Sequence, residues 1–226
     1  MTPNRTARAA GALYLAMMPL GAFGILYVPT ALVVPGDAAA TAERIAASEG
    51  LFRTAIVSHL LSQVVFVFLV LTLYRLFEGV NVRHARLMVV LALLGVPIAM
   101  MSEVSALAAL MMLDTPASGM LTEGQIHAHA MSLLGVRAQT ILVAQIFWGL
   151  WLLPLGALAF RSGFVPRVIG VLLAVAGAGY FIDSMTQLLS PGFPVVSVVT
   201  FVGELALTLW LLIKGVSAER RPVPAT

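Results

Sequence analysis

Six long apolar stretches alternate with short polar connections along this chain of 226 residues. A helix needs about 20 apolar residues to cross the hydrocarbon core of a bilayer. The stretches that meet this requirement are residues 10–33, 51–77, 87–113, 128–160, 168–189 and 195–213. The pattern predicts an all-α fold, a polytopic transmembrane bundle of six helices. We expect one domain over residues 1–216 and a disordered cytoplasmic tail over 217–226.

The basic residues lie mainly on one side of the predicted spans. Ten of the 13 Lys and Arg residues share that side, namely Arg5, Arg8, Arg75, Arg83, Arg86, Arg161, Arg167, Lys214, Arg220 and Arg221. Because Lys and Arg are enriched in cytoplasmic loops, both termini are predicted to be cytoplasmic. The first apolar stretch exceeds the roughly 7–15 residues of a signal-peptide core, so we interpret it as an uncleaved membrane helix.

Composition narrows the function classes. Hydrophobic residues make up 60% of the chain and charged residues 10%, against about 25% charged in soluble domains. The net charge of +3 comes from scattered basic residues, so no nucleic-acid partner is predicted. Cysteine is absent, which excludes thiol catalysis and cysteine-based metal sites. His127 and His129 are two residues apart on a helix and point apart, so neither a metal nor a cofactor is predicted.

Local signals predict finer features of the helices. Residues 41–50 are expected to form a short helix outside the membrane, with Thr41 as its N-cap and Gly50 as its stop. Pro19, Pro97 and Pro154 are expected to kink their helices. The glycines of the fifth span predict close helix packing; they are Gly170, Gly177 and Gly179.

The stretch Gly135–Gly156 carries an arginine, Arg137, inside an apolar run. Ionisable residues inside spans are costly, and they suggest a functional site. The other polar residues singled out in the spans are His59, Gln63, Glu103, Tyr180, Asp183 and Glu204. With a rise of about 1.5 Å per residue, the ionisable ones lie about 9–15 Å from the outer ends of their helices. We therefore predict one polar layer in the outer half of the membrane, with Arg137 paired to one or two carboxylates.

Three hypotheses for function remain open at this point. The first is an uncharacterised membrane protein with an outward-facing polar pocket, binding or transporting a small polar or anionic molecule at Arg137. The second is a non-catalytic accessory protein, whose polar layer is a buried salt-bridge network that orients the helices. The third is an intramembrane enzyme with a carboxylate as general base. No nucleophile or metal set is recognisable, which favours a non-enzyme. A proton-coupled step is a further alternative for the layer.

Several motifs resemble those of a known family. They are Pro35-Gly-Asp-Ala-Ala-Ala-Thr41, Leu51-Phe-Arg53, Leu73-Tyr-Arg75, the run from Ile146 to Gly156, Ser162-Gly-Phe164 with Pro166-Arg167, and Gly179-Tyr180 with Asp183-Ser184. In this order they resemble the bacterial membrane family called domain of unknown function 4386. The resemblance covers nearly the whole chain. It implies a multi-pass protein of the cytoplasmic (inner) membrane of a bacterium, with the lipid bilayer as its surroundings, and it implies no activity.

Overall fold

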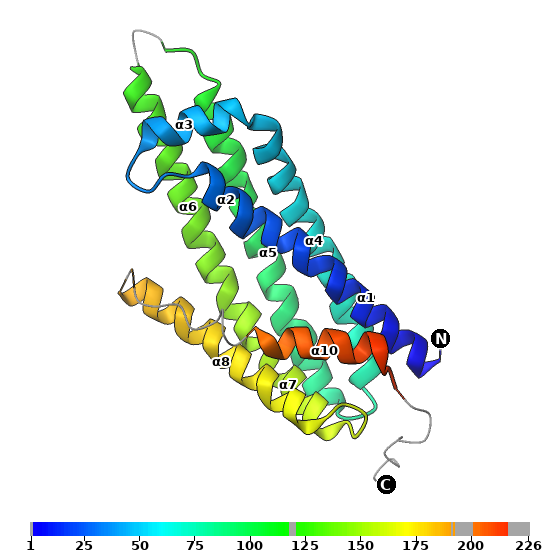
Figure 1. Ribbon diagram of the computed structural model, residues 1–226. Coiled ribbons are helices and arrows are strands. Elements are labelled where there is room, and N and C mark those ends of the chain that lie inside the picture. Colours follow the sequence, from blue (N-terminus) through cyan, green and yellow to red (C-terminus); the bar gives the residue numbers. More distant parts are fainter. Residues whose placement is uncertain (1, 118–120, 191, 193–200, 217–226) are drawn as a thin grey trace. The chain divides into compact units, whose positions relative to one another are not determined.

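The computed structural model describes residues 2–117, 121–190, 192 and 201–216, and every regular element in those residues is helical (Figure 1). The elements, in order, are α1 (Pro3–Ala22), the π-helical turn η1 (Phe23–Tyr27), α2 (Val28–Leu32), α3 (Ala38–Ala47), α4 (Glu49–Phe77), α5 (Val82–Leu113), α6 (Glu123–Leu150), α7 (Leu152–Arg161), α8 (Arg167–Leu189) and α10 (Val202–Ile213).

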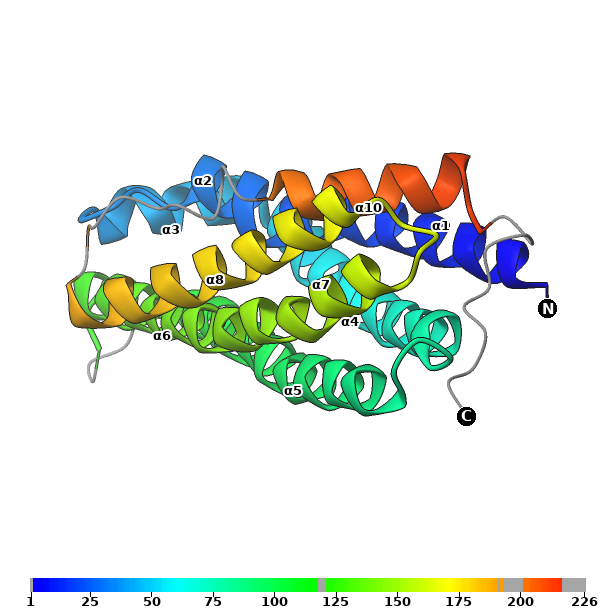
Figure 2. The ribbon, with the colours of Figure 1, turned by 90° about the horizontal axis from the view of Figure 1, so that it is seen from below.

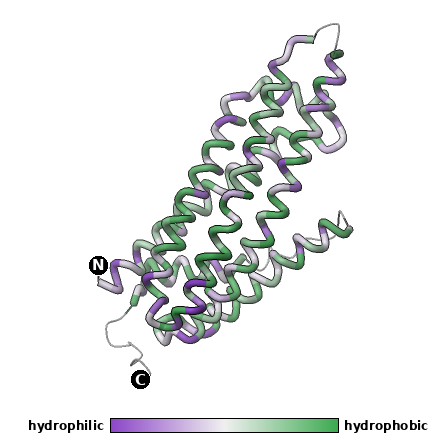
Figure 3. Tube along the Cα trace, turned by 180° about the vertical axis from the view of Figure 1, so that it is seen from behind, coloured by the Kyte–Doolittle hydropathy of each residue, from purple (hydrophilic) through white to green (hydrophobic). Residues whose placement is uncertain are grey.

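Five helical stretches are long and apolar enough to cross a membrane. They are Pro3–Leu32, Glu49–Phe77, Val82–Leu113, Glu123–Arg161 and Arg167–Leu189. In Figure 3 the colours of hydrophobic residues run along the long helices. The predicted sixth span, 195–213, falls partly outside the described residues, and its described part, α10, is a shorter apolar helix. The predicted tail at 217–226 lies wholly outside them. The chain thus has the helices of a multi-pass membrane protein.

Helix boundaries depart from the sequence prediction where polar residues extend a span. The first helix begins at Pro3 and α5 begins at Val82, both earlier than predicted. Their first turns carry arginines such as Arg5 and Arg83. Long arginine side chains reach polar surroundings from a helix end. A helix can therefore continue past its apolar section, which a hydropathy pattern does not register.

The prediction for the short helix before α4 was wrong at both ends. Its N-cap is Asp37, whose side chain accepts a 2.9 Å hydrogen bond from the Ala40 amide. Thr41 lies inside α3 instead, and its hydroxyl is bound to the carbonyl of Asp37 at 2.8 Å. Gly50 does not stop the helix but lies in the first turn of α4. An aspartate caps at least as well as a threonine, so the earlier cap determines where α3 starts.

The chain divides into two compact units. Unit 1 contains residues 1–16, 65–96 and 142–226, and unit 2 contains residues 17–64 and 97–141. Helices α1, α4, α5 and α6 each contribute residues to both units. The described elements α7, α8 and α10 belong to unit 1, whereas η1, α2 and α3 belong to unit 2.

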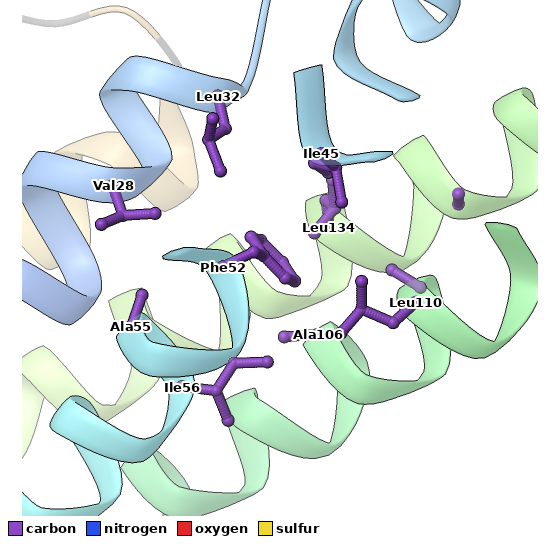
Figure 4. Close-up of a cluster of buried hydrophobic side chains, with 11 residues drawn as sticks. Val28, Leu32, Ile45, Phe52, Ala55, Ile56, Ala106, Leu110 and Leu134 are labelled. Atoms are coloured by element: carbon purple, nitrogen blue, oxygen red, sulfur yellow. The ribbon is translucent and has the colours of Figure 1, made fainter. Parts of the chain in front are cut away.

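Unit 2 has an apolar core near α3 (Figure 4). Phe52 of α4 is 3% exposed and lies among buried side chains of several helices. The labelled partners in the figure are Val28, Leu32, Ile45, Ala55, Ile56, Ala106, Leu110 and Leu134. Ile45 comes from α3, so this short helix contributes its apolar face to the core.

In unit 1, glycines allow two antiparallel stretches to meet backbone to backbone. A Cβ built at Gly149 would lie 2.5 Å from the Gly177 carbonyl oxygen, and one at Gly156 would lie 2.7 Å from that of Gly170. The prediction of close packing is thereby confirmed for Gly170 and Gly177. Figure 2 shows α7 and α8 side by side. In lipid, burying apolar side chains between helices gives little gain, because lipid tails are equally apolar. Small residues let the helix backbones approach closely, and van der Waals contact then stabilises the pair.

The prolines predicted to kink their helices lie inside helical stretches. Pro19 lies within α1 and Pro97 within α5. Helix α6 ends at Leu150 and α7 begins at Leu152, and the backbone of Trp151 between them is helical. Pro154 has no amide hydrogen to donate four residues back, to the carbonyl of Leu150. The kinks themselves stay a prediction.

Gly149→Ala should destabilise the protein because the added methyl would meet the backbone of α8. Overpacking of this kind costs about 1–3 kcal/mol. Gly135→Ala, in the same helix, is the matched control, since nothing lies within 4 Å of its Cβ position. Thermal unfolding of the two purified variants measures the difference. Equal unfolding temperatures would contradict the packing of Gly149 against α8.

Candidate functional site: a buried charged cluster in unit 2

Arg137 of α6 forms a forked ion pair with Glu103 of α5. Its Nη2 donates to Glu103 Oε1 at 2.8 Å, and its Nε donates to Oε2 at 3.3 Å. Arg137 is 6% exposed and Glu103 is 1% exposed. A two-point contact fixes the plane of the guanidinium as well as its distance. The intramembrane arginine is thus neutralised by a carboxylate of unit 2.

His59 of α4 binds the same carboxylate. Its Nδ1 lies 2.6 Å from Glu103 Oε1. An ionised carboxylate only accepts hydrogen bonds, so Nδ1 is the donor. The other ring nitrogen, Nε2, lies 3.2 Å from Gln63 Nε2. With the amide in this orientation, Gln63 Nε2 donates and the ring Nε2 accepts. The Glu103 carboxylate thus connects α4 and α6 and balances the charge of Arg137.

A free backbone carbonyl provides the remaining contact of Arg137. Its Nη2 also donates to the Gly24 carbonyl oxygen at 3.0 Å. Gly24 lies in the π-helical turn η1, where the Val28 amide binds the Phe23 carbonyl. The next amide position belongs to Pro29, which has no N–H. Neither helical partner is left for the Gly24 carbonyl, so the guanidinium takes their place.

Glycine is required at position 24 for close approach. A Cβ there would lie 2.7 Å from the Ala55 carbonyl oxygen and 2.7 Å from His59 Cβ. The π turn therefore lies directly against α4 at the residue that binds Glu103. Ser102 adds a weaker contact, with its hydroxyl 3.3 Å from Glu103 Oε1. These contacts hold the first span, α4, α5 and α6 together around one carboxylate.

Two atoms at the edge of this cluster lack a protein partner among the described residues. Gln63 Oε1 is buried without a hydrogen bond. Arg137 Nη1 makes no hydrogen bond with the described residues either. Unlike Gln63 Oε1, this nitrogen is not fully buried. Nη1 carries two N–H donors. The cluster therefore retains donor capacity beyond the ion pair.

The other predicted site residues belong to unit 1. Tyr14 of α1 donates a 2.6 Å hydrogen bond to Glu204 Oε2, and Tyr180 of α8 interacts with the same carboxylate. Asp183 is also buried, at 1% exposure. Of the seven predicted residues, the structure joins His59, Gln63, Glu103 and Arg137 in one network, and it assigns Tyr180, Asp183 and Glu204 to the other unit.

Two contacts of these clusters were not predicted from the sequence, for different reasons. They are the hydrogen bond from Tyr14 to Glu204 and the one from Arg137 to the Gly24 carbonyl. The position of Tyr14 could have been predicted from its spacing, because it shares one helical face with the small residues Ala7, Ala10 and Gly11, and all four are buried. A single phenol in a stripe of small residues faces a neighbour and needs a hydrogen-bond partner. Gly24 had no comparable signal, because its carbonyl becomes available only through the π turn.

The cluster consists of one ion pair, between Arg137 and Glu103, with His59 bound to the same carboxylate. No group of three or more His, Asp and Glu residues suited to a metal ion occurs within 2–117, 121–190, 192 and 201–216. The ring nitrogen and the carboxylate that could transfer a proton are bonded to each other. The arrangement offers hydrogen-bond donors and acceptors around one buried ion pair.

The sequence matches the model of one known protein family. The model of the domain of unknown function DUF4386 matches residues 9–215. The chain belongs to this family. An uncharacterised protein from Archaeoglobus fulgidus is similar to the DUF4386 chain, with 39% identity over 71 residues. The match covers 31% of this chain and 43% of that relative, so the chain spans less than half the length of the relative it matches. No solved structure matches.

In this DUF4386 protein, Gly24→Ala should destabilise unit 2 because the methyl would collide with α4 beside His59. We expect a loss of about 1–3 kcal/mol from overpacking. The control is Gly21→Ala, one turn earlier, where the nearest atom to the added Cβ is Ser62 Oγ at 3.8 Å. Thermal unfolding in detergent measures both variants. A Gly24→Ala protein as stable as Gly21→Ala would contradict the close approach of η1 and α4.

Proposed function

We propose that this protein is a non-enzymatic, transport-related membrane protein that binds a small anion at Arg137. The observation that carries the proposal is the unpartnered Nη1 of a guanidinium whose other contacts lie within a buried network. A carboxylate or phosphate oxygen is the natural partner for such a group. Glu103 acts as an internal competitor, because it holds the same guanidinium while no ligand is bound.

The geometry supports binding better than catalysis. The two serine hydroxyls of the cluster are engaged with the backbone. Ser62 and Ser102 each donate a hydrogen bond to a carbonyl one turn earlier. A nucleophile needs a base that takes its proton. His59, the nearest base, instead donates to Glu103. The cluster offers recognition and charge balance without an activated nucleophile.

A purely structural network is the second candidate, favoured by the complete pairing of Glu103. Its Oε1 receives bonds from His59 and Arg137, and its Oε2 receives one from Arg137. Removal of one partner from a buried ion pair costs about 3–5 kcal/mol, whereas replacement of both by apolar residues is often neutral. A variant in which apolar residues replace both Glu103 and Arg137 should therefore keep its stability but lose any bound anion.

The proposal includes six spans with both termini in the cytoplasm of a bacterium. Topology can be tested with single cysteines, because the chain has none of its own. Thr115→Cys, after α5, should react with a membrane-impermeant maleimide in spheroplasts. Gly79→Cys, between α4 and α5, should react only after permeabilisation. The opposite pattern of labelling would reverse the topology, and the cysteine-free wild type controls for background.

Anion binding is tested by the effect of acetate and succinate on thermal unfolding, at constant ionic strength and with chloride as the reference anion. A ligand at 100 times its Kd stabilises the folded protein by about 2.7 kcal/mol. We expect stabilisation of the wild type by at least one anion. Glu103→Gln should bind that anion about ten-fold more tightly, because its internal competitor is removed.

The matched control is the double variant Glu103→Met with Arg137→Met. It removes both charges, so it should fold with near wild-type stability and show no effect of acetate or succinate. A wild type that no anion stabilises, beside a Glu103→Gln variant without gain, would contradict ligand binding and favour the structural network. Arg137→Gln alone should be destabilised and insensitive to acetate and succinate.

A further inference from the structure

A positively charged feature lies in unit 1, at the turn between α7 and α8. A cavity of about 680 Å³ is formed there by the turn and by one side chain of α10. Its lining includes Phe160, Arg161, Gly163, Phe164, Arg167 and Trp210. Arg161 and Arg167 are exposed, so the cavity opens to the surface of the unit.

No carboxylate of the described residues compensates the charge of this cavity. No acidic residue is among its lining residues, and neither Arg161 nor Arg167 forms an ion pair with any described carboxylate. The Arg167 guanidinium carbon lies 5.5 Å from the centre of the Phe160 ring, a cation–π contact. This contact orients the side chain but leaves its charge unneutralised. Two arginines facing one cavity favour an anion with several oxygens.

The turn that carries the cavity is held in place by its own hydrogen bonds. The Val165 amide donates to Ser162 Oγ at 3.1 Å, and Trp210 Nε1 donates to the Phe164 carbonyl at 3.0 Å. The Phe164 ring stacks on Phe77 of α4, with centroids 5.4 Å apart. The cavity is therefore preorganised, which lowers the cost of ordering a bound group.

We propose that this cavity binds a phosphate group, supplied by an anionic membrane lipid such as phosphatidylglycerol. Lipid is the favoured source because large apolar side chains are exposed beside the arginines, with Phe160 at 42% and Val168 at 62% exposure. These surfaces suit acyl chains, while Arg161 and Arg167 suit the headgroup. Basic pockets between helices on the cytoplasmic side bind such headgroups. The predicted topology puts this turn on that side.

The site does not rest on anion binding at Arg137, since it uses residues of the other unit. Its test is retention of lipid by the full-length protein, purified in detergent with equal amounts of phosphatidylglycerol and phosphatidylcholine and analysed by native mass spectrometry. We expect preferential retention of phosphatidylglycerol. Arg161→Gln or Arg167→Gln should weaken it about five-fold each, and the double variant should abolish the preference.

The control is the double variant Arg83→Gln with Arg86→Gln, which removes two exposed positive charges from the same predicted side but outside the cavity. It should retain the preference. Equal loss in both double variants would overturn the site, because it would show general attraction to basic residues. A parallel arm uses inorganic phosphate and glycerol phosphate in thermal unfolding. Stabilisation there, without any preference for phosphatidylglycerol, would overturn the lipid as the source.

Discussion

The buried charge of Arg137 is the constraint on which the arrangement of unit 2 depends. An arginine at the centre of a spanning helix costs about 2.5–3.5 kcal/mol even on the mildest scale. Unit 2 offsets this cost with the Glu103 carboxylate on one side and the Gly24 carbonyl on the other. The carbonyl is available because Pro29 and the π turn deprive it of a helical partner. An irregularity in one helix thereby stabilises a charge on another.

Much of this fold could be predicted from the sequence, for a physical reason. In lipid the backbone must satisfy its own hydrogen bonds, so long apolar runs become helices and hydropathy finds them. The same regularity makes depth predictable, since the rise per residue is constant. His59, Glu103 and Arg137 were predicted to lie in one layer, and they are in contact. Helix ends were less predictable, because Arg5 and Arg83 extend helices beyond their apolar parts.

Lateral neighbours could not be predicted in the same way. Depth along a helix does not say which helices touch, so Glu204 fell in the same predicted layer as Arg137. It belongs instead to unit 1, where Tyr14 donates to its Oε2. The two acidic residues therefore have different chemistry. Glu103 faces an arginine and a histidine, whereas Glu204 faces the phenols of Tyr14 and Tyr180. Glu204 Oε1 is buried without a hydrogen bond within the described structure.

Hydrogen-bond capacity in the unit 2 cluster is unevenly distributed. Glu103 receives hydrogen bonds from His59 and from two nitrogens of Arg137, so its carboxylate is fully engaged. At the edge of the cluster, Gln63 Nε2 lies 3.2 Å from His59 Nε2, while Gln63 Oε1 is buried without a partner among the described residues. Rotation of the Gln63 amide by half a turn would exchange these two atoms, so the amide can present either a donor or an acceptor to the ring. The open capacity of the cluster therefore lies on the Gln63 amide and on Arg137 Nη1, and not on the carboxylate that joins the helices.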